Sequence, residues 1–251
     1  MKNTEIAKTK NAELTRPAPS AMMVPDVEGL EMSELTQYLP YLVLIQGSSN
    51  PLKDEFPDVK DGDIISNDGT PLDQPLEIQL LKGKIVYIER EVKLDKDGKL
   101  DNMSAGKIGN KDNKEFLDFQ SDWVSQGHSC TSEGNLIYCT TADGELKRIF
   151  ESSLIMLVLV GKLPYQISFK SVSKQVAAKK MLASLYRQMD RLGKTNLFEL
   201  VVRLKSRKQK NQAGISYFSF DSQFSREATP EEVAAGRKFI GVDVDLDNVH
   251  E

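Results

Sequence analysis

The chain has 251 residues, of which 39% are hydrophobic and 28% are charged, and its net charge is −4. This composition is typical of a soluble globular protein. Two cysteines are too few for a disulfide framework and suit a reducing compartment. The longest apolar run, Leu154 to Val160, is far shorter than the roughly 20 residues of a membrane-spanning helix. The first residues also lack the apolar run of a signal peptide. We therefore expect a cytoplasmic protein and exclude a disulfide-rich scaffold and a helical membrane protein.

The N-terminal part of the chain carries few signals of regular structure. Residues 1–37 are polar and contain three prolines without a lasting periodicity, which predicts a disordered or loosely draped arm. We expect a single domain over residues 38–240. Its first strand is predicted at Tyr41–Gln46, because the turn residues from Gly47 to Pro51 follow directly.

The middle of the chain alternates between strand-like and charged segments. Two strand-like runs surround Lys82–Lys84, and the stronger one is Ile85–Val92. Residues 95–145 begin with charged, glycine-punctuated sequence, so we expect a long loop insertion there. The apolar run 153–160 and the alternating residues 165–169 then predict a hairpin.

The clearest helix signal covers residues 173–192, where apolar side chains recur at spacings of three and four and Gly193 follows as a stop. Alternation predicts two further strands, at 198–205 and 214–220. Thr229 starts a short helix, because proline and two glutamates follow it in capping order. The polar face of the long helix carries the cations Lys179, Lys180, Arg187 and Arg191.

The order strand, strand, helix, strand, strand predicts an α+β, β-rich protein. It matches the OB-fold, a five-stranded barrel that has its helix between strands 3 and 4 and binds oligonucleotides with a strand face and with loops 1–2 and 4–5. An open antiparallel sheet with helices on one face is the alternative. In the barrel, residues 95–145 would join strands 1 and 2, and the basic tip 206–213 would join strands 4 and 5. We assign the five strands to residues 84–94, 153–160, 165–170, 198–205 and 214–220.

Positive charge is concentrated in one part of this acidic chain. Between Lys162 and Lys210 there are thirteen Lys and Arg against two acids, a net charge of +11, so the rest of the chain carries −15. Such asymmetry is typical of a surface that binds a polyanion. A solvated helix face next to a Lys-rich turn would give the same count, and that reading stays open.

Single strands are held by cations along the phosphates and by aromatic rings under the bases. The last predicted hairpin has both cations and aromatic rings. Arg203 and Lys205 share a strand face, further cations lie in the turn, and aromatic residues lie on the returning strand. Tyr217 and Phe218 face opposite ways, so only one of them can be exposed on a given side, and either could belong to the core. We expect the helix cations to extend the same surface. The residues expected to contact nucleic acid are Lys170, Lys174, Arg203, Lys205, Arg207, Lys208, Lys210, Tyr217, Phe218 and Trp123.

The two cysteines invite a metal interpretation. With His128, Cys130 and Cys139 supply three ligands, whereas a structural zinc ion takes four. We therefore expect two reduced cysteines in a hairpin, and neither metal nor cofactor.

An enzyme has a weak basis in this sequence. Asp58, which follows a proline, and Glu91 with Lys93 match the loose pattern of a nuclease superfamily that binds Mg²⁺ through two carboxylates. The spacing is long and such short patterns arise by chance. There is no phosphate-binding glycine loop, and we expect no enzyme.

Several segments resemble a family of phage-encoded proteins similar to single-stranded-DNA-binding proteins. They are Pro40–Gly47, the Gly-His-Ser-Cys segment at 127–130, Ile167–Ser171 with the helix after it, and Leu204–Gly214. The resemblance covers residues 38–240 and implies a phage protein that acts in DNA replication or recombination. Relatives have more cysteines in the central segment, so an inherited zinc site is not expected.

The acidic residues 241–251 resemble in composition the tails with which bacterial and phage single-stranded-DNA-binding proteins shield their binding surface and recruit replication partners. An edge strand over Phe239–Leu246 is the alternative. We thus expect sequence-tolerant binding of single-stranded DNA in the host-cell cytoplasm. A phage virion or assembly protein and a Mg²⁺-dependent nuclease remain the alternatives, and the oligomeric state stays open.

Overall fold

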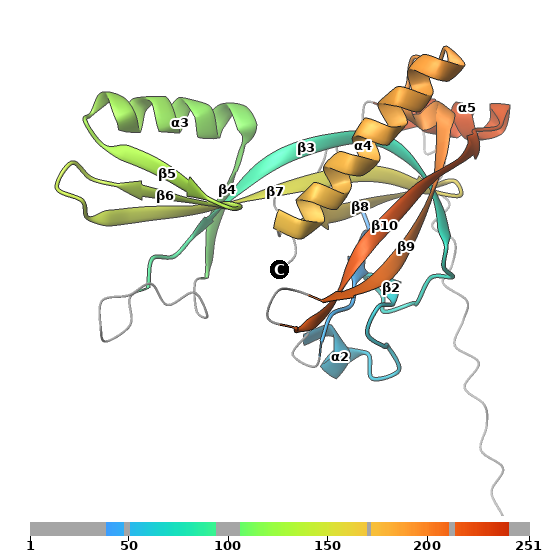
Figure 1. Ribbon diagram of the computed structural model, residues 1–251, viewed down its shortest axis with the longest axis horizontal. Coiled ribbons are helices and arrows are strands. Elements are labelled where there is room, and N and C mark those ends of the chain that lie inside the picture. The colour runs from blue at the N-terminus through green and yellow to red at the C-terminus, as the bar shows by residue number, and fades with distance from the viewer. Residues whose placement is uncertain (1–38, 48–50, 94–105, 170–171, 211–213, 241–251) are drawn as a thin grey trace, which may run out of the picture. The chain divides into compact units, whose positions relative to one another are not determined.

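The computed structural model describes residues 39–47, 51–93, 106–169, 172–210 and 214–240 of the chain (Figure 1). The protein is α+β and rich in strands, as the sequence predicts. The predicted arm 1–37 and the predicted tail 241–251 lie outside the described residues. The strands are β1 Tyr41–Leu44, β2 Ile64–Ser66, β3 Leu76–Arg90, β4 Lys107–Asp112, β5 Ser129–Glu133, β6 Leu136–Thr140, β7 Leu146–Val160, β8 Leu163–Phe169, β9 Leu200–Lys210 and β10 Ser216–Glu227. The helices are α2 Pro51–Glu55, α3 Asn113–Ser125, α4 Val172–Leu192 and α5 Pro230–Lys238, with a 3-10 turn, η2, at Leu197–Glu199.

The described strands form one mixed sheet with the order β10-β9-β3-β7-β8-β1-β2. All pairs are antiparallel except β1 with β8. The long strands β3 and β7 run on beyond this path, where β4 pairs with β3, β6 with β7, and β5 with β6. We call β4, α3, β5, β6 and the parts of β3 and β7 that pair with them the lobe.

The sequence predicts several elements correctly. The hairpin of β7 and β8, the helix α4 and the capped helix α5 lie where expected. The strand expected at 84–94 lies within the longer β3, Leu76–Arg90, since a bulge between Leu80 and Lys82 lets both strand-like runs join one strand. The antiparallel alternative is wrong because β1 runs parallel to β8.

The long loop expected over 95–145 is wrong for its described part, because residues 106–145 contain β4, α3, β5 and β6. The helix α3 starts with a capping box, in which Asp112 accepts from the backbone N–H of Glu115 and the Glu115 carboxylate accepts from that of Asp112. It is held in place by Phe116, whose ring stacks 3.8 Å from that of Tyr87 and lies 5.1 Å from that of Phe150. The segment before α3 is charged and contains glycines, so the sequence there predicted a loop and not a helix.

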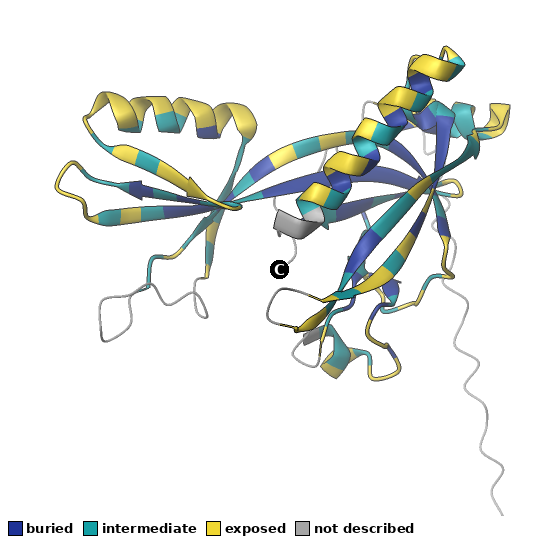
Figure 2. Cartoon of the chain, viewed as in Figure 1, coloured by how far each residue is buried: buried dark blue, intermediate teal, exposed yellow. Residues whose placement is uncertain are grey.

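The second half of β7, Leu154–Val160, is a continuous apolar run because both of its faces are buried there (Figure 2). Leu154, Met156 and Val158 pack with α4 in the main core. Ile155 and Leu157 point the other way, into a second core that Phe239 of the α5 end helps to cover. Helices therefore cover both faces of the sheet, which also contradicts the alternative of an open sheet with helices on one face.

Side-chain amides join the edge strand β10 and the strand β9 to the other end of the sheet. The Gln46 amide donates to the carbonyl of Phe218 and accepts, at 2.9 Å, from the Phe218 N–H. The Gln74 amide accepts from Ser206 N–H at 2.6 Å and donates to the Gly62 carbonyl at 2.9 Å. An amide side chain can donate and accept like a peptide group. These two glutamines therefore make the kind of hydrogen bonds that a neighbouring strand would make, at places where the described residues form no strand pairing.

Candidate nucleic-acid interface

The hairpin of β9 and β10 carries most of the residues expected to bind nucleic acid. Its strands pair from Leu200 opposite Glu227 to Lys210 opposite Ser216. Side chains alternate across a strand, and Val202 and Leu204 are buried in the core that α4 also joins. We call this side of the hairpin the inner face and the opposite side the outer face. Towards the tip, the outer face carries Arg203, Lys205, Arg207 and Gln209 of β9 and Tyr217, Ser219 and Asp221 of β10.

Two outer-face cations have acidic partners. Arg203 Nε lies 3.4 Å from Glu77 Oε1, and Lys205 Nζ lies 3.8 Å from Asp221 Oδ2. Both basic side chains are 57% exposed. Ion pairs this exposed contribute only about 0–1 kcal/mol, so a phosphate group can replace the carboxylates at little cost.

The base of the hairpin is fixed by a charge network that shares Glu77 with Arg203. The Arg226 guanidinium donates to both oxygens of Glu232, at 2.7 and 2.8 Å, and to Glu77 Oε2 at 2.9 Å. The hydrogen bonds from Arg226 are the main cause that lowers the pKa of Glu232 to about 2, and the same contacts raise the pKa of Arg226. This network ties β10 to α5 and β3, and it leaves Arg226 occupied rather than available to a ligand.

The cations nearest the tip have no ion pair within the described part of the chain. Arg207, Lys208 and Lys210 are all exposed. A loop was expected over 206–213, but β9 continues to Lys210, and residues 211–213 lie outside the described residues. Alternation along the strand therefore turns Arg207 to the outer face and Lys208 and Lys210 to the inner side, beyond the core.

Tyr217 and Phe218 have different environments. The Tyr217 hydroxyl donates to Gln209 Oε1 at 2.9 Å, and Gln209 Nε2 donates to Ser219 at 2.6 Å, so a half-buried ring is held on the outer face. The Phe218 ring instead packs against Gly62, with the Gln46 amide on its backbone. Of these two aromatics, only Tyr217 shares a face with Arg207. Gln209 was not among the residues expected to bind nucleic acid. Alternation along β9 puts it on the same face as Arg207, and the strand register puts it opposite Tyr217.

The cations of α4 do not extend the outer face. Met181 and Leu185 are buried in the core on the inner side of the hairpin, so the opposite face of α4 points away from the sheet. The structure thus turns the helix cations and the outer-face cations in opposite directions. Lys170 lies outside the described residues, and Lys174 lies in α4 with a side chain that is not described.

Trp123 belongs to the packing of the lobe. Its Nε1 donates to the Thr140 carbonyl at 3.2 Å, and its ring lies 5.7 Å from that of Phe119 and 4.5 Å from that of His128. The ring is half-buried. The Phe119 and His128 rings pack against the indole ring itself, so the described surroundings favour a structural role over that of a base platform.

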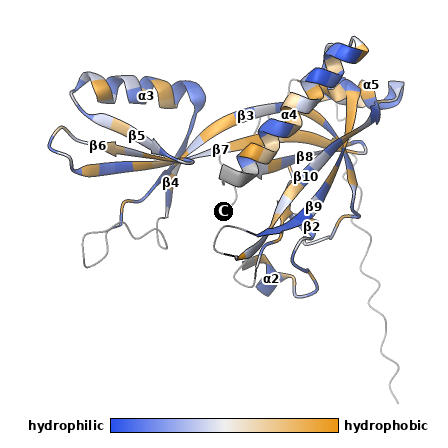
Figure 3. Cartoon of the chain, viewed as in Figure 1, coloured by the Kyte–Doolittle hydropathy of each residue, from blue (hydrophilic) through white to orange (hydrophobic). Residues whose placement is uncertain are grey.

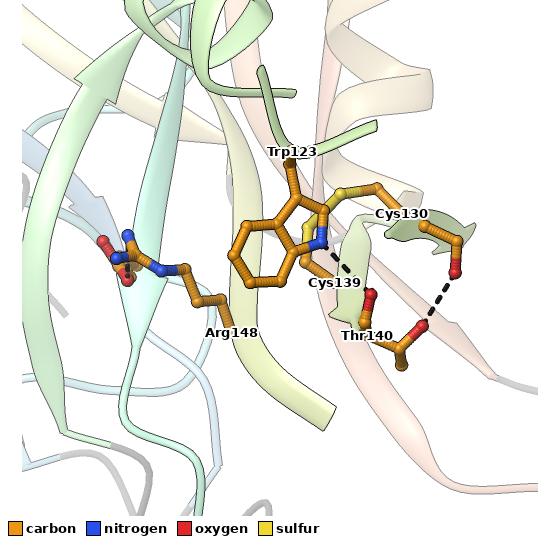
Figure 4. The surroundings of a disulfide bond; sticks show 7 residues. Trp123, Cys130, Cys139, Thr140 and Arg148 are labelled. Atoms are coloured by element: carbon orange, nitrogen blue, oxygen red, sulfur yellow. Dashed lines mark hydrogen bonds and ion pairs between the residues drawn. A yellow bond between two sulfur atoms is a disulfide. The ribbon is translucent and has the colours of Figure 1, made fainter. Parts of the chain in front are cut away.

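The two cysteines face each other from β5 and β6 and form a disulfide (Figure 4). The expectation of a hairpin is confirmed, but that of reduced thiols is wrong, because the register places Cys130 directly opposite Cys139. His128 Nδ1 accepts from the Ala142 N–H at 3.1 Å. Among the described residues there is no group of three His, Cys, Asp or Glu side chains that could hold a metal ion.

The structure does not bring the residues of the nuclease pattern together. Asp58 precedes the turn at Gly62, which Gln74 ties to the start of β3. Glu91 follows the far end of that strand, whose fourteen residue steps from Leu76 to Arg90, at about 3.3 Å each, cover roughly 45 Å along the chain. Lys93 Nζ is paired with Glu91 at 3.0 Å.

Comparison with protein-family models, with curated proteins and with solved structures finds no match to this chain. Within the described ranges, no helix has both the length and the apolar character needed to cross a membrane.

Proposed function

We propose that this protein binds single-stranded DNA without sequence preference, with the β9–β10 hairpin as its contact surface. The observation that carries the proposal is the charge of β9, which has five cations and no acid. Those nearest the tip, Arg207, Lys208 and Lys210, are exposed and have no ion pair within the described ranges. Tyr217 lies beside Arg207 on the outer face and would supply the ring on which a base stacks.

We also propose that β3, β7, β8, β9 and β10 correspond to the five strands of an OB-type barrel. Two observations support this: these strands neighbour one another in the order β10-β9-β3-β7-β8, and α4 connects the third to the fourth. In this correspondence the lobe takes the place of the loop between strands 1 and 2, and the hairpin tip is the loop between strands 4 and 5. Both loops are ligand-binding regions in OB-folds.

The resemblance of several segments to phage-encoded proteins supplies the biological setting of this proposal, which is phage DNA replication or recombination. In that setting the acidic residues 241–251 would recruit replication or recombination proteins. A virion or assembly protein whose hairpin contacts another protein is the competing function.

A salt series with a labelled oligonucleotide tests the proposal. On single strands, log K falls against log salt with a slope of about −0.7 per neutralised phosphate. Replacing Arg207, Lys208 and Lys210 together by Ala should therefore flatten the slope by about 2. An unchanged slope would remove the hairpin from the binding surface.

The matched control neutralises three exposed cations outside the hairpin and the lobe, Lys60, Arg237 and Lys238. It changes the net charge by the same amount, so it should leave the slope close to that of the wild type if binding depends on the hairpin and not on total charge. Absence of oligonucleotide binding by the wild type would favour the virion or assembly function. Mg²⁺-dependent cleavage of the oligonucleotide would favour a nuclease.

A further inference from the structure

The exposed face of α4 is a second concentration of positive charge, on the other side of β10 from the outer face. Ala178, Met181, Leu185 and Met189 bury the apolar side of the helix in the core, at 9% exposure or less. From residue 175 onward, hydrophilic residues of the opposite side alternate along the helix with these apolar ones (Figure 3). That side consists of Val176, Lys179, Lys180, Ala183, Tyr186, Arg187, Asp190 and Arg191, which are all exposed.

The charges of this face are not organised for helix stability. Four cations stand against one acid, Asp190, and none of the four has an ion pair within the described part of the chain. Arg187 and Arg191 are four residues apart, a spacing at which like charges destabilise a helix by about 0.2–0.5 kcal/mol. Arg187 Nε donates to its own helix, to the Ala183 carbonyl at 3.1 Å. A surface helix that served solubility alone would carry acids at these spacings.

Tyr186 lies midway along this face, on the same side as Lys179, and is 53% exposed. Its nearest neighbours on the helix surface are Ala183, which is small, and Asp190, while the cations lie around this group. No hydrogen bond or ring contact of Tyr186 exists within the described residues. An exposed aromatic ring among cations is the combination that single-stranded nucleic acid uses, because bases stack on the ring while phosphates bind the cations.

We propose that the exposed face of α4 is a second contact surface for single-stranded nucleic acid, with Tyr186 as the base platform and Lys179, Lys180, Arg187 and Arg191 as phosphate contacts. This inference rests on the proposed function of the hairpin, since the same ligand would pass from the outer face around β10 to α4. From Lys179 to Arg191 the face is about 18 Å long. A strand that reaches both surfaces must therefore be longer than one that covers the hairpin.

Two other partners fit this face less well. A helix that inserts into a lipid surface needs a broad apolar face, but that of α4 is buried. Among the side chains of α4 that the structure describes, only Val176 and Tyr186 are large, apolar and exposed. The centre of a protein interface is depleted in charge, and in lysine especially, whereas this face carries four cations. Phosphates spaced along a flexible strand match it best.

The test compares two thymidine oligomers, one of about 5 nucleotides and one of about 20, which fall near the lower limit and beyond the upper limit of a single OB-type site. Tyr186→Ala should weaken binding of the long oligomer about tenfold and leave the short one unchanged. Tyr186→Phe keeps the ring and should bind both like the wild type. Ile240→Ala, at a residue after α5 that is 51% exposed, controls for the loss of apolar surface.

Neutralising Lys179, Lys180, Arg187 and Arg191 together should flatten the salt slope for the long oligomer by up to about 2.8, and leave that for the short one unchanged. Equal effects on both oligomers, or none on either, would overturn the inference. If the α4 variants bound the long oligomer normally but lost binding to phosphatidylglycerol vesicles, the face would be assigned to lipid. If they instead lost self-association, the face would be assigned to a second copy of the chain, and either result would overturn the inference. Since the short oligomer reports on the hairpin, its loss in the Arg207, Lys208 and Lys210 variant supports the proposed function whatever the α4 variants show.

Discussion

Replacement of Gly62 by alanine should destabilise the protein by more than its backbone conformation alone requires. The φ angle of Gly62 is +91°, and a Cβ built on it would lie 2.6 Å from Phe218 Cε1 and 2.8 Å from Cδ1. The left-handed backbone costs an L-residue about 1–2 kcal/mol, and overpacking of a fitted site adds about 1–3 kcal/mol. We therefore expect Gly62→Ala to lower the free energy of unfolding by roughly 2–5 kcal/mol.

Gly161 separates the two contributions. Its φ angle is +63°, and a Cβ there would meet nothing within 4 Å. Gly161→Ala should therefore cost only the backbone contribution of about 1–2 kcal/mol. Urea denaturation, followed to a midpoint at constant m-value, measures both variants.

A double-mutant cycle between Gly62 and Phe218 tests this prediction most directly. The Gln46 amide holds the Phe218 backbone at both its N–H and its carbonyl, so the ring can yield only by rotation. If the ring causes the extra cost, Gly62→Ala in a Phe218→Ala background should cost no more than Gly161→Ala does. Equal costs for Gly62→Ala and Gly161→Ala in the wild-type background would refute this account of how the hairpin is seated.

Two further predictions concern stability. The disulfide closes a loop of nine residue steps between Cys130 and Cys139, so its reduction by dithiothreitol should lower the free energy of unfolding by about 2.6 kcal/mol in the chain-entropy account. Reduced and oxidised protein with the same urea midpoint would contradict this, and the Cys130→Ser, Cys139→Ser variant should not respond to dithiothreitol. The pKa of Glu232 is lowered to about 2 in the folded protein, so the stability it contributes is present above its ordinary pKa of about 4.5 and is lost as the pH falls towards 2. Glu232→Gln keeps a side chain that can cap α5 and should lower the free energy of unfolding by about 1–2 kcal/mol at pH 7. This difference between wild type and variant should shrink as the pH falls from 4.5 to 2. A pH-independent difference in urea midpoints would rule out the pair with Arg226.

The proposed contact surface was only partly predictable from sequence. The concentration of cations near Lys208 is visible in the printed chain, because charge is a property of each residue. Which face each cation occupies depends on how far β9 extends, and the strand continues to Lys210 where a turn was expected. Tyr217 and Phe218 look equivalent in sequence, and only the packing of Phe218 on Gly62 distinguishes them.

Local pattern by itself determined the periodic elements of this protein. Residues close together in sequence are enough to predict the apolar half of β7, the amphipathic helix α4 and the capped start of α5. Tertiary structure alone decided the parallel neighbour of β8, the disulfide between β5 and β6, and the opposite directions of the α4 and outer-face cations. The physical reason is that spacing along the chain reports which side of an element is apolar. The choice of what covers that side depends on contacts between segments that are distant in sequence.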